Sequence, residues 1–217
     1  MRMKRYLLPA IVIGFAVNLA VALAAPPSSS LNIKASPNPV VFGKSVALSG
    51  HLTGKNKAGK TIQVQADAFP YEGDFKNVAS ATTANSGAWA TSHKPAVNTR
   101  YRARQGSTIS GVVTELVRIR VSLKVSDRTP AAGHRVRLSG RACPQHDGAR
   151  VKIQRRTRTG KWRTKARTRL RDIPGSTCSK YSKRLRVFSD GRYRAFVVSP
   201  DKDHANGRSR SRRINVH

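Results

Sequence analysis

The chain has 217 residues and a formal net charge of +32, from 42 Lys and Arg against 10 Asp and Glu. Such an excess favours an anionic partner. Only two cysteines occur and they have no Cys-x-x-Cys spacing, which argues against a cysteine-based metal site. No Gly-x-Ser-x-Gly elbow, phosphate loop or placeable pair of catalytic carboxylates occurs, so we expect no enzymatic activity and no cofactor.

Residues 1–24 have the pattern of a secretion signal: three basic residues, an apolar run and the small-x-small cleavage site Ala22-Leu23-Ala24. An uncleaved membrane anchor is the alternative, because an apolar stretch of about 20 residues can span a bilayer. Residues 25–30, rich in Pro and Ser, predict a flexible lead-in. We therefore expect a secreted, extracellular protein, with association with the cell wall as one option.

The remainder of the chain repeats itself. Gly43-Lys-Ser-Val-Ala-Leu-Ser-Gly50 recurs as Gly133-His-Arg-Val-Arg-Leu-Ser-Gly140, and Arg100-Tyr-Arg-Ala103 recurs unchanged as Arg192-Tyr-Arg-Ala195. The order and spacing of the matches are kept, at an offset of about 90 residues, which indicates a duplicated domain rather than a solenoid unit. The predicted domains are residues 31–120 and 121–217.

Polar and apolar residues alternate throughout both copies, and Gly, Pro and Asn turn signals punctuate them. This pattern predicts an all-β fold of two tandem immunoglobulin-like antiparallel β-sandwiches with seven short strands each. The junction 116–125 contains neither Pro nor Gly, so one copy should run straight into the next as a stiff rod. Strands are expected near 31–36, 44–51, 61–67, 75–82, 87–93, 99–105, 112–120, 121–126, 134–140, 150–156, 162–169, 180–187, 191–198 and 209–216.

The Gly-x-x-Val-x-Leu-Ser-Gly strand, the following Gly-x-x-Ile/Val-x-Val/Ile-Gln strand and the Arg-Tyr-Arg-Ala strand resemble bacterial immunoglobulin-like or fibronectin-type-III-like repeats of secreted actinobacterial surface proteins. The resemblance covers nearly all of the chain after the predicted signal. It implies two antiparallel sheets with Greek-key connections in each copy, and a role as a spacer, an adhesive module or a carbohydrate-associated accessory. It implies no role for a particular residue.

Cys143 and Cys178 both lie in the second copy, and an exported chain favours one structural disulfide between them. Cys178 lies in the segment 172–182, where the second copy is about five residues longer than the first. The bond would pin this insertion, and closing a loop of about 35 residues stabilises by about 3–4 kcal/mol in the chain-entropy model.

The charge is uneven between the copies: residues 25–115 hold 10 Lys and Arg against 4 acids, and residues 116–217 hold 29 against 6. Basic residues flank a predicted turn at 159–160 and return at period two, so they predict a hairpin with a continuous basic outer face. Guanidinium groups bind phosphate and carboxylate bidentately. The candidate polyanion-binding residues are Arg155, Arg156, Arg158, Arg163, Lys165, Arg167, Arg169, Arg184 and Arg186.

Aromatic residues occupy equivalent positions in the two copies, Phe75 with Trp162 and Trp89 with Tyr181, which favours packing over a sugar-stacking platform. The six histidines have no metal-ligand spacing, so no metal site is expected. The close set His146-Asp147 beside Cys143 is explained equally well by a turn next to a disulfide.

These features predict a secreted, non-enzymatic protein that binds an anionic cell-envelope polymer or extracellular polysaccharide through its Arg-rich second domain. Non-specific nucleic acid is a further candidate polyanion, because phosphate contacts do not read bases. Two alternatives stay open. One is a structural or adhesive spacer whose charge is incidental, and the other is a carbohydrate-binding accessory protein that uses exposed aromatic rings.

Overall fold

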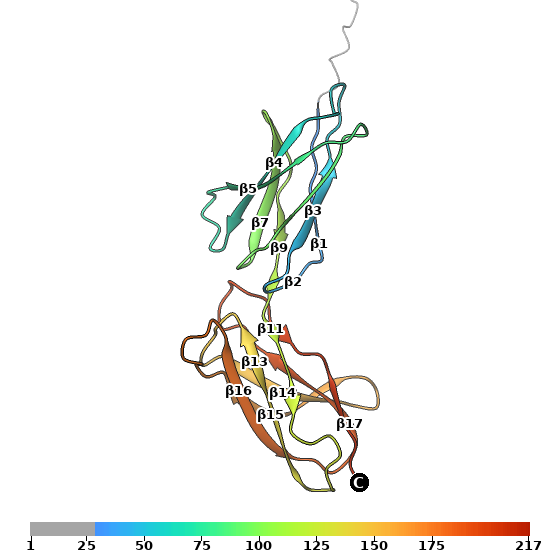
Figure 1. Ribbon diagram of the computed structural model, residues 1–217, viewed down its shortest axis with the longest axis vertical. Helices are drawn as coiled ribbons and strands as arrows, with labels where there is room; N and C mark the ends of the chain where they lie inside the picture. Colours follow the sequence, from blue (N-terminus) through green and yellow to red (C-terminus); the bar gives the residue numbers. More distant parts are fainter. Residues whose placement is uncertain (1–28) are drawn as a thin grey trace, which may run out of the picture.

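The computed structural model describes residues 29–217, in which every regular element is a β-strand (Figure 1). Because this part of the chain contains no helix, none there has the length and apolar character needed to cross a membrane. The all-β prediction is confirmed. The predicted secretion signal, residues 1–24, and most of the predicted lead-in lie outside the described residues.

We call residues 29–118 the N-terminal half. Its first sheet has the strand order β1-β3-β6, and its second has the order β5-β4-β7, with β7 also pairing β8 and β9. β2 pairs β10 in parallel. The strands are β1 (Lys34–Ser36), β2 (Val40–Val41), β3 (Val46–His51), β4 (Thr61–Ala68), β5 (Lys76–Thr82), β6 (Ala88–His93), β7 (Thr99–Gln105), β8 (Thr108–Ile109), β9 (Val113–Glu115) and β10 (Val117–Arg118).

We call residues 119–217 the C-terminal half. One sheet is built on β13, which pairs β11, β12 and β16, and the other has the order β15-β14-β17, with β18 and β19 both on β17. The strands are β11 (Arg120–Val121), β12 (Lys124–Val125), β13 (Arg135–Cys143), β14 (Arg150–Arg156), β15 (Trp162–Arg169), β16 (Ser179–Arg186), β17 (Gly191–Val197), β18 (Gly207–Arg208) and β19 (Arg212–Ile214).

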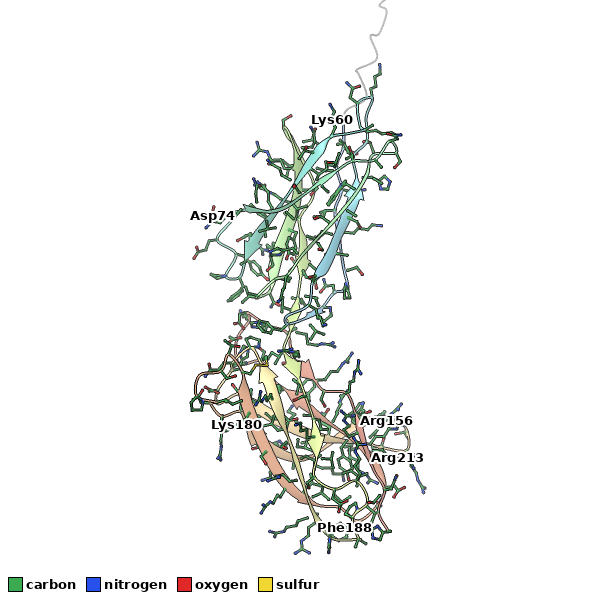
Figure 2. All side chains as sticks on the ribbon, in the orientation of Figure 1. Lys60, Asp74, Arg156, Lys180, Phe188 and Arg213 are labelled. Carbon is green, nitrogen blue, oxygen red and sulfur yellow. A yellow bond between two sulfur atoms is a disulfide. The ribbon has the colours of Figure 1, made fainter. Side chains whose placement is uncertain are left out.

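Each half encloses its own hydrophobic core, with side chains filling the space between its sheets (Figure 2). Val46 and Leu48 on β3 are buried while their neighbours on the strand are exposed, and Val136 and Leu138 repeat this alternation on β13. Burying one face of each sheet against the other is what a period-two pattern requires. Each half is consistent with a β-sandwich, whereas the immunoglobulin-like assignment and the domain bounds stay predictions.

The duplication extends to individual contacts. The guanidinium of Arg102 lies over the Phe75 ring at 4.1 Å, and that of Arg194 lies over the Trp162 ring at 4.2 Å. Each arginine Nε also donates to a glutamine on the neighbouring strand, at 2.7 and 2.8 Å respectively. Both rings are half-buried on the outer face of a sheet under an arginine, while Trp89 is fully buried in the core.

The repeated Leu-Ser-Gly motif ends in a glycine because no side chain fits there. A Cβ on Gly50 would overlap the carbonyl oxygen of Asn32, and one on Gly140 would overlap that of Ser122. The Tyr181 hydroxyl donates to the same Ser122 oxygen at 2.5 Å. The motif therefore specifies close approach between β13 and the strand region that precedes it.

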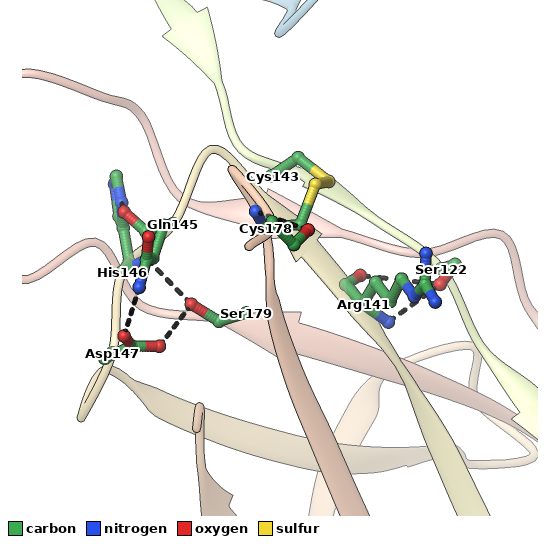
Figure 3. Close-up of a disulfide and its surroundings, with 9 residues drawn as sticks. Ser122, Arg141, Cys143, Gln145, His146, Asp147, Cys178 and Ser179 are labelled. Carbon is green, nitrogen blue, oxygen red and sulfur yellow. Dashed lines mark hydrogen bonds between the residues drawn. A yellow bond between two sulfur atoms is a disulfide. The ribbon is translucent and has the colours of Figure 1, made fainter. Parts of the chain in front are cut away.

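The predicted disulfide is present and joins Cys143, at the end of β13, to Cys178, just before β16, with a Cα–Cα distance of 4.4 Å (Figure 3). The loop beside it is also held by hydrogen bonds. The backbone N–H of His146 donates to the Ser179 hydroxyl at 2.9 Å, and that hydroxyl donates to Asp147 Oδ1 at 2.7 Å. The insertion is thus anchored to the end of the sheet as expected.

The junction between the halves is broken into short strands rather than running straight through. Residues 113–125 change partner along their length: β9 pairs β7, β10 pairs β2, and β11 and β12 pair β13. The two halves lie end to end (Figure 1). A loop of the C-terminal half, residues 198–206, which we call the junction loop, bonds to the N-terminal half. The Asn98 side chain donates to Lys202 O at 2.7 Å, and Ala205 N donates to Val117 O at 2.8 Å.

Candidate anion-binding groove

The predicted basic hairpin forms from β14 and β15, which pair antiparallel across a tight turn closed by a 2.7 Å bond from Thr157 N to Lys161 O. Arg156 and Arg158 are exposed beside this turn. The local pattern of alternating residues therefore positions these cations in solvent, as the sequence indicated.

A β-bulge interrupts the expected stripe on β15. The register between β14 and β15 shifts near the middle of the pair and leaves Lys165 without a partner opposite it. One extra residue moves the side chains beyond it to the other face of the sheet. Arg167 and Arg169 are consequently on the opposite face from Arg163, although all of these side chains are exposed. The prediction of one continuous basic face was wrong.

Arg155 turns away from the outer surface. It lies directly opposite the buried Tyr193 on β17, so its side chain is on the inner face of the sheet and is half-buried. Its Nη2 donates to the Ser189 hydroxyl at 2.8 Å and to the Asp190 carbonyl oxygen. Arg155 therefore braces the end of the sandwich and does not lie on the outer face with the exposed cations of the hairpin, and its part in anion binding stays a prediction.

Arg184 and Arg186 belong to the other sheet. They lie on β16, directly opposite Arg137 and Arg135 on β13, and do not extend the hairpin. Figure 2 shows Lys180, also on β16, and Arg156 on opposite sides of the C-terminal half. The nine predicted residues are thus split between two sheets instead of forming one surface.

A groove of about 920 Å³ lies over the β13–β16 sheet, and we call it the C-terminal groove. Three of its lining side chains, Arg137, Arg141 and Lys180, are named the groove cations below. Two backbone hydrogen bonds of 2.8 Å hold Arg171, the residue just before the disulfide-anchored insertion, beside Lys180 and so add a further charge at the groove edge. The lining residues are Ser122, Lys124, Arg137, Ser139, Gly140, Arg141, Arg171, Ile173, Lys180, Tyr181 and Ser182.

The five cations of this groove are not neutralised by the protein. No Asp or Glu lines it, and within residues 29–217 the only Lys or Arg in an ion pair are Lys76, with Asp74, and Arg213, with Asp190. Arg141 lies directly opposite Lys180 across the two strands. Like charges placed opposite each other weaken a sheet, so these side chains are not there to stabilise the fold.

The N-terminal half contains the equivalent groove with a single basic residue, Lys34. It measures about 290 Å³ and is lined by Asn32, Lys34, Ser49, Gly50, His51, Ala88 and Trp89. By repeat alignment and strand register, Ala47, His51 and Ala88 occupy the positions of the three groove cations. The same backbone therefore carries one lysine in one copy and five cations in the other.

The sequence did not indicate the groove, because its basic residues are not close together along the chain. Three of the five basic residues that line the groove are spread over β12 and β13, and only Arg184 and Arg186 of the predicted set lie on this sheet. The available signal was the repeat itself: comparing the copies position by position marks each place where a neutral residue has become basic.

The aromatic rings offer little platform for a sugar. Trp89 is only 3% exposed, and Arg194 covers Trp162. Burial, together with the neighbouring Arg208, lowers the pKa of Arg194, as expected for a guanidinium packed against a ring beside another cation. Among the described aromatic residues Phe188 is the large exposed one, at 68%.

The sequence did not indicate one group of side chains that could hold a metal ion. His146, Asp201, Asp203 and His204 each offer a ligand atom, and these atoms all lie within 4.8 Å of one another at the junction. They come from two loops that are distant in the sequence, which is why no ligand spacing was visible. The pKa of Asp201 is raised because its carboxyl hydrogen-bonds that of Asp203 and is partly desolvated.

No protein-family model matches the chain, and no curated protein matches it either. The resemblance to actinobacterial surface repeats therefore stays a prediction.

Proposed function

We propose that this is a secreted, non-enzymatic protein that binds an anionic cell-envelope or extracellular polymer along the C-terminal groove. The observation that carries the proposal is the pair of equivalent grooves: one unneutralised cation, Lys34, lines the first, whereas five line the second. A charge gained only for solubility would be expected to mix both signs over the surface.

The chemistry of the groove suits a chain of repeated anions. Arg137 and Arg141 are four residues apart on one strand, so their stems are separated by roughly 13 Å, which exceeds the size of a single phosphate. Guanidinium groups pair with phosphate or carboxylate oxygens through two parallel hydrogen bonds. Such contacts position a polymer without reading its sequence, which admits nucleic acid as a further ligand.

The proposed location outside the cell has two supports. The Cys143–Cys178 disulfide is a bond that persists in oxidising compartments and is rare in cytosolic proteins. The predicted secretion signal of residues 1–24 is the second support. The partner polymers of that environment include phosphate-rich and uronic-acid-rich chains, both of which present regularly spaced negative charge.

A spacer with incidental charge is the second candidate function. Its support is the junction loop, which bonds to the N-terminal half through both backbone and side-chain groups, as a stiff tandem connection requires. The carbohydrate-accessory alternative is disfavoured by the buried Trp89 and the covered Trp162.

The test is retention on isolated cell envelope and on neutral dextran over a salt series. The groove variant changes the three groove cations to the residues of the other copy, Arg137→Ala, Arg141→His and Lys180→Ala, which the same fold already accommodates. The control variant Arg156→Ser, Arg158→Ser and Arg167→Ser removes the same amount of charge from the other sheet and its hairpin. We expect only the groove variant to lose envelope binding. Equal losses in the groove and control variants would mean that net charge alone, and not the groove, determines binding.

The reciprocal transfer tests sufficiency. Ala47→Arg, His51→Arg and Ala88→Lys place the three groove cations in the N-terminal groove. The proposal predicts stronger envelope retention at a given salt concentration than the wild type. Unchanged retention, in a variant whose circular dichroism matches the wild type, would show that the groove geometry is not what binds.

A further inference from the structure

The junction holds two histidines whose free ring nitrogens face the same carboxylate. His204 Nδ1 lies 2.8 Å from Asp203 Oδ1, and His146 Nε2 lies 3.8 Å from the same oxygen. The two imidazole rings meet edge to face with centroids 5.0 Å apart. Asp201 completes the group from the exposed side of the junction loop.

Backbone carbonyl groups fix which nitrogen of each ring is free. His204 Nε2 lies 2.8 Å from the carbonyl oxygen of Ala96, and His146 Nδ1 lies against that of Gln145, so each of these nitrogens carries a hydrogen that it donates. The other nitrogen of each neutral ring then has a lone pair directed at Asp203. Metal-binding histidines are typically held this way, with the second N–H donated to a carbonyl or carboxylate.

These lone pairs are buried and unsatisfied. The side chains of His146 and His204 are only 5% and 3% exposed, and Asp203 is 28% exposed. His146 Nε2, His204 Nδ1 and Asp203 Oδ1 all lack a hydrogen-bond partner of acceptable geometry. Three electron-rich atoms that converge without a donor between them form an unfavourable arrangement that a cation would relieve.

We propose that this junction group, His146, Asp201, Asp203 and His204, binds a divalent transition-metal ion, with Zn²⁺ as the best match. Imidazole nitrogen with carboxylate oxygen is a donor set that suits Zn²⁺. Tetrahedral Zn²⁺ with bonds of about 2.0–2.1 Å holds its ligand atoms roughly 3.3 Å apart, which lies between the 2.8 and 3.8 Å separations observed here.

The ion would join three segments of the fold. His146 follows the disulfide-bonded Cys143 on the loop after β13, and the other ligands lie on the junction loop. The junction loop contacts the N-terminal half through Ala96, and the ring of Phe42 from that half packs edge-on against His204 at 5.9 Å. Metal binding would therefore stiffen the connection between the halves, a role separate from the C-terminal groove.

The test titrates chelator-treated full-length protein with Zn²⁺ by calorimetry and with Co²⁺ by visible absorption, near pH 7.5. We expect one site per chain and the intense absorption of tetrahedral Co²⁺. The variant Asp201→Asn changes an exposed ligand and should weaken binding by roughly tenfold or more, with a larger loss for His204→Ala. His134→Ala removes an exposed histidine outside the group and should leave the affinity unchanged.

Circular dichroism of each variant separates loss of a ligand from loss of folding. If His204→Ala disturbs the junction, the exposed Asp201→Asn still tests the site in a folded protein. Two results would overturn the proposal. One is absence of Zn²⁺ binding by the wild type. The other is a loss of affinity in His134→Ala equal to that in the ligand variants.

Discussion

Replacing Gly140 by Ala should destabilise the C-terminal half selectively. The new methyl group would overlap the Ser122 carbonyl oxygen and lie 2.7 Å from the Tyr181 hydroxyl. The hydroxyl is the far end of a side chain and can move, but the carbonyl belongs to backbone that pairs with β13, where Ser122 N donates to Arg141 O at 2.9 Å. Relief therefore requires a shift of the strand pairing that underlies the C-terminal groove.

The magnitude follows from two opposing effects. Overpacking a fixed site costs about 1–3 kcal/mol, and the lower entropy of an unfolded chain with Ala in place of Gly offsets about 0.4–1 kcal/mol. Because the overlap is with backbone, the cost of Gly140→Ala should lie near the upper end of the overpacking range, and we expect a net loss of about 2 kcal/mol in the free energy of unfolding. For a unit of this size that lowers the melting temperature by about 8–16 °C.

The melting temperature is measured by thermal unfolding. Hydrogen exchange then measures the protection of peptides from each half separately. Gly111→Ala is the control, because a Cβ at Gly111 meets nothing within 4 Å. Gly50→Ala should reverse the result and weaken the N-terminal half. A melting temperature for Gly140→Ala within about 2 °C of the wild type would refute the steric reasoning.

Three further predictions concern stability and the junction. Burial raises the pKa of Glu115 to about 7, although the 2.8 Å bond from Val40 N opposes the shift. Because the folded state then holds a proton that the unfolded state releases, stability should fall by roughly 3 kcal/mol as pH rises from about 4.5 to 7; urea unfolding of Glu115→Gln should show no such fall. Changing Cys143 and Cys178 to Ser should lower the free energy of unfolding of the C-terminal half by about 3–4 kcal/mol, because the disulfide closes a loop with a sequence separation of 35 residues. If denaturation of the wild type were the same with and without reductant, this prediction would be contradicted. Asn98→Ala removes the side-chain bond to Lys202 and another to Val117, so X-ray scattering should show a broader range of angles between the halves; an unchanged profile would argue against the loop as the stiffening element.

The positions of the longer strands were predictable because polar and apolar residues alternate within each of them, and this alternation is visible in the local sequence. β7 matches the predicted range 99–105, and β14 and β15 match 150–156 and 162–169. The two-residue strands β2, β8 and β18 were not foreseen, because so short a segment has no alternation to detect and is defined only by its partner. The same reason explains why the predicted strand 112–120 divides into β9 and β10, which pair with different strands.

The binding surface was harder to predict because it depends on register rather than on composition. The bulge at Lys165 reverses the faces of the basic strand, and nothing in the local pattern indicates it. Arg155 faces inward because it aligns with Tyr193, a relation between strands distant in the chain. At the junction, folding brings His146 beside Asp201, Asp203 and His204 of the junction loop, and the sequence gives no sign of this convergence.

The measurement that tests the central claim most directly is the salt dependence of affinity for inorganic polyphosphate, for the wild type and for the Arg137→Ala, Arg141→His, Lys180→Ala variant. If all five basic residues that line the C-terminal groove displace counterions, the logarithm of affinity should fall with the logarithm of salt concentration with a slope of about −3.5 to −4.5. The variant should retain a slope of only about −1.5 to −2. Equal slopes for the two proteins, or binding by the wild type that is indifferent to salt, would contradict the account.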